Sequence, residues 1–259
     1  MISNWFITGD THGNIIPRLE YIQTKYPDCV PEETALIVLG DVGFNYYRKK
    51  KDAYNKEQAN NFGYKIYCLR GNHEERPSNL DIPIKWDADV MGEVHIEKEY
   101  PNIRYFTDDG GVYLIGGLMC ATVPGAYSID KFYRLERGFA WFPNEQLSSL
   151  ERQTLQEKLS GRYFDIVLSH TCPYSWRPTD LFLNGINQST VDNTMEFWMD
   201  ELKNTFTWDH WFFGHYHADR LERPNVFQMY ESVMPLFTAL NIMDSPIGIN
   251  KSPNYFMGV

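Results

Sequence analysis

The 259-residue sequence predicts an α/β fold, and three patterns support this prediction. Short apolar runs stop abruptly at Gly, Asp, Asn or His, as buried strands do where they leave a sheet. Stretches with helical character lie between several of these runs, so strand and helix alternate along the chain. Additional apolar runs interrupt the alternation, which favours two packed sheets of mixed strand direction over one wholly parallel sheet.

The expected strands share this abrupt polar ending. The five clearest occupy residues 5–8, 35–39, 66–69, 166–168 and 211–213. Weaker apolar runs at residues 94–96, 112–115 and 226–230 predict further strands. Each of the five clear runs is followed at once by polar residues, so the polar chemistry of the chain lies at the carboxyl ends of its expected strands.

The expected helices lie between these runs, and some begin with residues that cap helices well. They occupy residues 15–25, 53–61, 144–159 and 192–203. No repeat, low-complexity segment or long linker divides the chain, and its length suits one large domain, which we expect to span residues 1–259. Residues 245–259 are interrupted by Pro and Gly, which predicts a loosely structured tail.

Composition narrows the class of function. A net charge of −10 disfavours a protein that wraps a long nucleic acid, although a nucleotide substrate stays compatible with it. The four cysteines are widely spaced without a CxxC pair, which predicts buried free thiols and neither a zinc ribbon nor a redox pair. The first residues do not resemble a signal peptide, and no later stretch is apolar enough to span a bilayer. We therefore expect a cytoplasmic protein without a membrane partner.

Five of the seven histidines lie in the polar segments that follow the clear strands: His12, His73, His170, His215 and His217. Loops beyond the carboxyl ends of strands converge in α/β proteins, so these side chains are expected to meet. One Asp-x-His after a strand is usually a turn, and one His-x-His arises often by chance. Four of the five polar segments contain these histidines and the fifth contains Asp41, and this order along the chain argues against an accidental arrangement. For the remaining His95 and His210, structural roles are expected.

The polar segments also carry a family resemblance. The sequence GDTHG at residues 9–13, GD at 40–41, GNHE at 71–74, the later His170 and GHYH at 214–217 resemble, in this order, the motifs of the calcineurin-like metallophosphoesterases. Similar small phosphoesterases occur in bacteria and their phages. The resemblance implies an α/β sandwich of two mixed β-sheets flanked by α-helices, in which two metal ions activate a bridging hydroxide for attack on a phosphate mono- or diester.

The resemblance also implies a role for each motif residue. It places Asp10, His12 and His217 on one metal ion, Asn72, His170 and His215 on the other, and Asp41 on both. Mixed carboxylate, imidazole and amide ligands suit first-row metals better than Ca²⁺ or a structural zinc. Mn or Fe is therefore expected, with Zn or Ni as alternatives. His73 corresponds to the acid that protonates the leaving group, and it is expected to contact neither ion.

The substrate stays open at this point. LRGNHE at residues 69–74 is similar to the Ser/Thr protein phosphatases and bis-nucleoside tetraphosphatases, but residues 40–45 lack the phosphate-binding arginine of those branches. GHYH is similar to the broader phosphomonoesterase and phosphodiesterase branches. The expected partners are a phosphorylated small molecule, a nucleotide or a phosphoprotein, with no long nucleic acid and an unknown oligomeric state. A non-catalytic scaffold of this fold is the alternative from another class, and the complete set of ligand types disfavours it.

Residues 124–141 lie between the third and fourth motifs and offer three expected substrate contacts, Tyr127, Lys131 and Arg134. Arg134 is the preferred one, because a guanidinium can bind two phosphate oxygens where an ammonium acts as a point charge. An amphipathic insert, whose basic residues meet acidic side chains, is the alternative. For Glu74 the sequence leaves two roles open, orienting an imidazole or capping a turn in solvent. Cys172 and Trp176 are expected either in a pocket wall or in simple packing.

Overall fold

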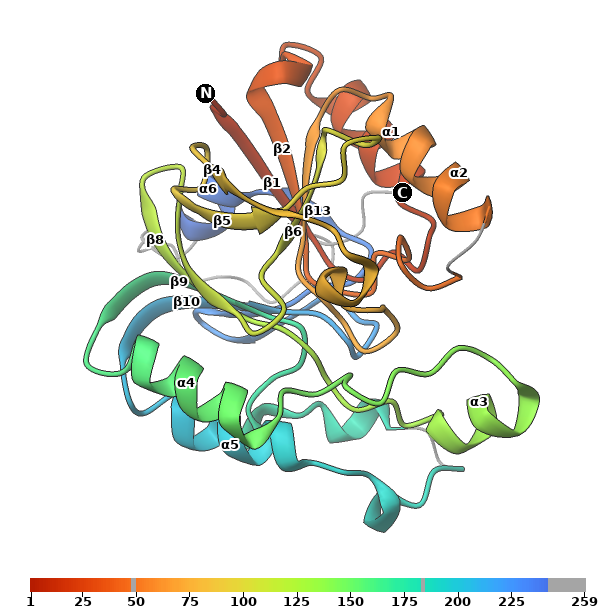
Figure 1. Ribbon diagram of the computed structural model, residues 1–259. Helices are drawn as coiled ribbons and strands as arrows, with labels where there is room; N and C mark the ends of the chain where they lie inside the picture. The colour runs from red at the N-terminus through yellow and green to blue at the C-terminus, as the bar shows by residue number, and fades with distance from the viewer. Residues whose placement is uncertain (48–49, 183–184, 242–259) are drawn as a thin grey trace.

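The computed structural model describes residues 1–47, 50–182 and 185–241. Within them, two β-sheets face each other and helices cover their outer sides (Figure 1). Both sheets contain parallel and antiparallel strand pairs. The predicted α/β sandwich of two mixed sheets is therefore confirmed. The tail expected at residues 245–259 lies outside the described residues.

The first sheet has a parallel centre with antiparallel strands at its edges. In spatial order its strands are β13 (Val233–Pro235), β1 (Asn4–Thr8), β2 (Thr34–Val38), β3 (Lys65–Cys68), β6 (Ile103–Phe106), β5 (Gly92–His95) and β4 (Ile84–Asp87). Strands β1, β2, β3 and β6 run parallel, and the other three pair antiparallel to their neighbours. The three clear runs expected before residue 70 are thus adjacent strands.

The second sheet repeats this plan. Its order is β11 (Arg220–Arg223), β12 (Val226–Gln228), β10 (Thr207–Phe213), β9 (Tyr163–Ser169), β8 (Leu118–Val123) and β7 (Gly111–Ile115). The four inner strands are parallel, and β11 and β7 run against them. Strands β9 and β10, each followed by histidines, lie side by side at the centre.

The helices are α1 (Ile16–Lys25), α2 (Lys50–Asn60), α3 (Lys131–Arg137), α4 (Ser149–Leu159), α5 (Thr194–Leu202) and α6 (Leu236–Asn241). Helices α1 and α2 cover the first sheet, and α4 and α5 cover the second, whereas α3 projects from the layers (Figure 1). No helix of the described residues has the length and apolar character needed to cross a membrane.

Burial on both faces explains why the central strands read as continuous apolar runs. In β1, Trp5 and Ile7 point into the core between the two sheets, whereas Phe6 points toward the helices of the first sheet. In β9, Ile166 faces the core between the sheets and Val167 faces the helices of the second. Each strand therefore buries apolar surface on both of its faces. Each Å² of apolar surface buried stabilises the fold by about 25 cal/mol.

One helix begins later than expected and one strand was not expected, each for an identifiable reason. Helix α4 begins at Ser149 and not at residue 144, because the Ser148 hydroxyl accepts from the Glu151 amide at 3.3 Å and the Glu151 carboxylate accepts from the Ser148 amide at 2.7 Å. This reciprocal cap fixes where the helix starts. Strand β8 was not expected, because its half-exposed start and its Thr122, whose hydroxyl accepts from the Gly111 amide at 2.9 Å, weaken the apolar signal.

The expected thiols are confirmed as free at Cys29, Cys68, Cys120 and Cys172, all but Cys29 buried. The strands that precede the polar segments also lie where they were expected. Strands β1, β2 and β3 of the first sheet and β9 and β10 of the second each lead directly into a polar segment that was singled out from the sequence. The loops that leave these strands are the ones that build the site.

Candidate metal centre

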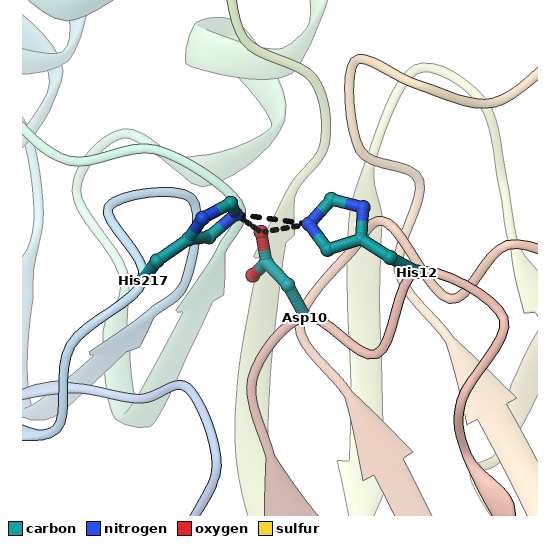
Figure 2. Close-up of side chains that lie close together, drawn as sticks. All are labelled: Asp10, His12 and His217. Atoms are coloured by element: carbon teal, nitrogen blue, oxygen red, sulfur yellow. Dashed lines mark hydrogen bonds and ion pairs between the residues drawn. The ribbon is translucent and has the colours of Figure 1, made fainter.

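Three side chains from two sheets converge at one point. Asp10 and His12 follow β1 of the first sheet, and His217 follows β10 of the second. The Nε2 atoms of His12 and His217 lie 2.9 Å apart, and they are 3.8 and 3.4 Å from Oδ2 of Asp10. Figure 2 shows both imidazoles directed at the carboxylate between them. Their ligand atoms are close enough together to hold one metal ion.

The two oxygens of Asp10 have different surroundings. Oδ1 accepts a hydrogen bond from the His215 amide at 2.9 Å. Oδ2 is buried and has no hydrogen-bond partner within the described residues. Burial raises the pKa of Asp10, but His170 and His217 outweigh this, so its pKa is below the usual value and the carboxylate is charged. The nearest ion-pair partners of this charged oxygen are the imidazole nitrogens at 3.4 and 3.8 Å, and a buried charge is costly without closer compensation. A carboxylate with two imidazoles around it is a donor set that fits a metal ion.

A second group of ligand atoms joins the first through Asp10. Asp10, Asp41 and His170 also offer atoms close enough to hold one ion. His170 is fully buried, and its Nε2 lies 3.6 Å from Oδ2 of Asp41 and 2.9 Å from Oδ1 of Asn72. Its Nδ1 lies 2.7 Å from the carbonyl of Leu39, which accepts only, so Nδ1 carries the proton and Nε2 is left with a lone pair.

His215 adjoins this second group, with its ring centroid 5.0 Å from that of His170. Burial, followed by the proximity of His170, lowers the pKa of His215 to about 3. The imidazole is therefore neutral at physiological pH, the form in which histidine binds metals. Burial raises the pKa of Asp41, but His73 and His170 hold it well below the usual range, so Asp41 is charged.

Backbone strain is concentrated in these loops. Six described residues other than Gly have a positive φ, and four of them are His12 (45°), Asp41 (48°), His215 (69°) and His217 (51°). Left-handed backbone is uncommon for side-chain-bearing residues and tends to mark functional sites. At Asp41 the conformation is secured by its carbonyl, which accepts from the His12 amide at 2.7 Å and from the Thr11 amide at 3.2 Å.

Two motif glycines are needed because the candidate ligands Asp41 and His170 leave no room for a side chain. A Cβ at Gly71 would lie 2.0 Å from Oδ1 of Asp41. A Cβ at Gly40, where φ is +102°, would lie 2.1 Å from Nδ1 of His170. The glycines of the GD and GNHE motifs thus let the loops after β2 and β3 approach the buried ligands.

His73 lies beside the ligand groups and faces a pocket of about 210 Å³. Its amide donates to Oδ1 of Asp41 at 2.8 Å, and its Nε2 lies 3.9 Å from Oδ2 of Asp41. Its Nε2 is also 3.3 Å from Nη2 of Arg134. The residues that line the pocket are His12, Asp41, Gly43, Tyr46, Tyr47, His73 and Arg134. The carboxylate, the imidazoles and the guanidinium therefore border one small space.

Only one of the three substrate contacts expected from residues 124–141 lines this pocket. Arg134 is held there by Asp130, which accepts from Nε at 2.8 Å, and by the Tyr46 hydroxyl at 2.7 Å from Nη1. The ammonium of Lys131 lies 4.2 Å from the centre of the Trp141 ring, and Tyr127 is buried. Neither of these belongs to the pocket lining.

Glu74 takes neither of the roles that the sequence left open. It is 5% exposed, so it is not a solvent-facing cap. Its Oε1 accepts from the Gly43 amide at 2.8 Å and its Oε2 from the Gly71 amide at 3.2 Å, so the carboxylate binds loop backbone and not an imidazole. Burial, followed by the charge of Asp41, raises the pKa of Glu74 to about 8. Glu74 joins the loops after β2 and β3.

The other residues that were singled out have packing or structural positions. Cys172 and Trp176 belong to the buried cluster between the second sheet and its helices, so packing is the reading that holds. His95 is buried in β5, with Nδ1 2.7 Å from the carbonyl of Ile82. His210 lies in β10 with its ring 6.4 Å from that of Phe227.

Sequence reasoning missed four residues around the site. Tyr46 and Tyr47 form a wall of the pocket, and the only signal for them was two adjacent aromatics soon after the GD motif. Ser128 contacts the amide of Asn72, and Glu145 contacts Ser128. Nothing in their local sequence distinguishes them, because the contact joins segments that are distant along the chain.

A comparison with models of known protein families identifies one family. The model of the calcineurin-like phosphoesterases matches residues 6–219. Among solved structures, a phosphopantetheinyl hydrolase from Mycobacterium tuberculosis is 13% identical, with a TM-score of 0.44, and the match covers 88% of each chain. A protein of unknown function from Aquifex aeolicus is 15% identical, with a TM-score of 0.31 over 65% of this chain and 80% of that one. No curated protein matches the sequence.

Proposed function

Because the chain belongs to the calcineurin-like phosphoesterase family, we propose that it hydrolyses phosphate mono- or diesters at a centre of two metal ions. Family membership supports metal-dependent phosphoester hydrolysis in general. The observation that carries the finer proposal is Oδ2 of Asp10, a buried carboxylate oxygen without a hydrogen-bond partner in the described residues. Asp10 belongs to both groups of potential ligand residues, so the two groups adjoin at this side chain.

In this proposal the two ions divide seven side chains. One ion would be held by Asp10, His12 and His217, the other by Asn72, His170 and His215, and Asp41 would contribute to both. Bound cations of this kind polarise a phosphoryl oxygen and make water more acidic. The mixed donor set favours Mn or Fe, with Zn or Ni as alternatives.

The residues of the pocket supply the remaining chemistry. The backbone amide of His73 donates to Asp41, which holds His73 beside the proposed shared ligand, and His73 lines the pocket. We assign to His73 the delivery of a proton to the leaving oxygen, which requires a group within hydrogen-bond reach. Arg134 lies 3.3 Å from His73, so an oxygen of the substrate held by its guanidinium is directed toward that imidazole.

The test is to load the full chain with Mn²⁺ and measure hydrolysis of an aryl phosphate monoester and its diester, with chelated protein as the control. Activity should require the metal. Asp41→Asn should lose metal and activity together. His73→Gln should keep both ions and lower kcat by roughly 100-fold, and less for a leaving group of low pKa.

Two results would contradict these assignments. Well-folded protein that carries two ions but turns over no phosphomonoester, phosphodiester, nucleotide or phosphopeptide would favour the non-catalytic scaffold. Loss of an ion from His73→Gln would show that His73 is a ligand and not the acid. Metal content is therefore measured on the same samples as activity.

A further inference from the structure

The side-chain amide of Asn72 has different partners at its two ends. Its Oδ1 lies 2.9 Å from Nε2 of His170, on the side of the candidate metal ligands. Its Nδ2 lies 2.9 Å from Oγ of Ser128. The two ends of an amide have nearly the same shape, so only hydrogen bonds decide which end faces which way. The oxygen end is the one that binds a cation.

Glu145 fixes the direction of the hydrogen bonds behind this amide. It is 3% exposed, and its carboxylate meets three donors. Its Oε2 accepts from the Ser128 hydroxyl at 2.6 Å and from Nε1 of Trp141 at 2.9 Å, and its Oε1 accepts from the Ser128 amide at 3.1 Å. A carboxylate only accepts, so the hydroxyl hydrogen of Ser128 is committed to Glu145.

That commitment determines what Ser128 presents to Asn72. With its hydrogen directed at Glu145, the Ser128 oxygen turns a lone pair toward the amide and can only accept. The NH₂ end of Asn72 must then face Ser128, and the oxygen end must face His170. The ring of His73 is also near Nδ2, at 3.2 Å from Nε2, but this contact is longer than the one to Ser128.

We propose that Glu145 and Ser128 are positioning residues whose hydrogen bonds, directed from Asn72 to Ser128 to Glu145, present the Asn72 oxygen to the second metal ion. The inference rests on the proposed two-metal function. It gives a second role to residues 124–141, which were expected to contact substrate, because Ser128 and Trp141 both bind Glu145. The base of this segment supports a ligand, whereas Arg134 reaches the pocket.

Glu145→Gln is the most informative substitution. It keeps the shape of the side chain but replaces one carboxylate oxygen, which accepts hydrogen bonds, by an NH₂ group, which donates them. If the new NH₂ takes the place of Oε2, the Ser128 hydroxyl loses its acceptor and turns its hydrogen toward Asn72, whose amide then flips. If the NH₂ takes the place of Oε1, it opposes the Ser128 amide. Losing such a supporting partner typically weakens metal binding by 10–100-fold, roughly the effect expected here on the second ion only.

The experiment titrates the metal-free full chain with Mn²⁺ and records the affinity of each of the two ions by calorimetry, with metal content as a check. Glu145→Gln and Ser128→Ala should both weaken the second ion. Glu97→Gln is the matched control, because Glu97 also accepts two hydrogen bonds, from Lys56 at 2.6 Å and Tyr105 at 2.8 Å, but lies in the segment that follows β5. It should leave both affinities unchanged.

A second background tests the direction of the bonds. In Asn72→Asp both ends are oxygens, and the Ser128 hydroxyl can donate to the new carboxylate when Glu145 is replaced. Adding Glu145→Gln to Asn72→Asp should therefore change the second affinity by less than about 3-fold. An equal loss in both backgrounds would overturn the proposal, since it would mean that Glu145 acts only through packing.

The outcomes separate this inference from the proposed function. If the unaltered protein binds fewer than two ions, the two-metal function itself fails. If it binds two and folded Glu145→Gln binds both with unchanged affinity, only the positioning role fails. Should Glu145→Gln not fold, Ser128→Ala decides, because unchanged binding of the second ion by that variant would equally overturn the proposal.

Discussion

Glu196 is a buried carboxyl group with too few partners, and replacing it by Gln should stabilise the protein at high pH. It lies in α5 and is 4% exposed. Its Oε1 accepts from the Thr171 hydroxyl at 3.0 Å, whereas its Oε2 has no hydrogen-bond partner in the described part of the chain. Burial raises the pKa of Glu196 to about 7.

The sign and size of the effect follow from this pKa. An ordinary glutamate has a pKa near 4.5, so between pH 4.5 and 7 the folded protein binds more protons at Glu196 than the unfolded chain does. Stability from this group is therefore full below pH 4.5 and falls until pH 7, then stays constant. At about 1.4 kcal/mol for each pH unit, the loss is on the order of 3 kcal/mol. Glu196→Gln cannot ionise and avoids it, while its amide oxygen can still accept from Thr171.

Urea unfolding of the metal-free proteins at pH 5 and pH 8 measures this. The free energy of unfolding of Glu196→Gln, relative to the unaltered protein, should be higher at pH 8 than at pH 5 by up to about 3 kcal/mol. Comparing the two pH values removes effects of shape that are the same in both. Glu157→Gln on the exposed side of α4 controls for the loss of one negative charge. A difference that is equal at both pH values would refute the reasoning.

Two further predictions concern the site. Arg134→Ala should lower kcat/KM by an amount equivalent to about 1–3 kcal/mol, the scale of one charge-assisted hydrogen bond. Metal content and Tm should stay nearly unchanged. If the variant is largely unfolded but its folded fraction is fully active, Arg134 is a structural residue. Gly71→Ala should reduce metal affinity by about 10-fold or more, because its Cβ would lie 2.0 Å from Oδ1 of Asp41. Gly185→Ala is the control, because a Cβ at Gly185 would meet no described atom within 4 Å beyond its chain neighbours. Full metal affinity in Gly71→Ala would contradict the crowding argument.

The strands that could be predicted from the sequence are those buried on both faces. β1, β2, β3, β9 and β10 lie between helices and the opposite sheet, so burial on both faces produces continuous apolar runs. The edge strand β4 has no such signal, since Ile84 and Trp86 are exposed. Short helix α3 also gave an ambiguous pattern, because none of its residues is buried. Pairing order in the sheets is a property of distant segments and leaves no local trace.

In the site, too, some residues could be predicted from the sequence and others could not. The residues grouped as ligands from the sequence were visible because each follows a clear strand, where loops of an α/β protein converge. The contacts that hold them were not visible. Arg134 meets Tyr46 across 88 positions and Asn72 meets Ser128 across 56, and no periodicity reports such a pair. The role of Glu74 was missed because its partners are backbone amides, which every residue type provides.

The candidate ligands come from loops of both sheets, and this has a consequence for the stability of the fold. Asn72 and His170, which meet at 2.9 Å, are 98 positions apart and belong to loops of different sheets. In the proposed two-metal state, the ions bind side chains that meet only in the folded chain, so their binding free energy would add to the free energy of unfolding. The four cysteines are free, so no disulfide contributes in this way. A chelator that removes the ions would therefore remove this part of the stability without any reduction step.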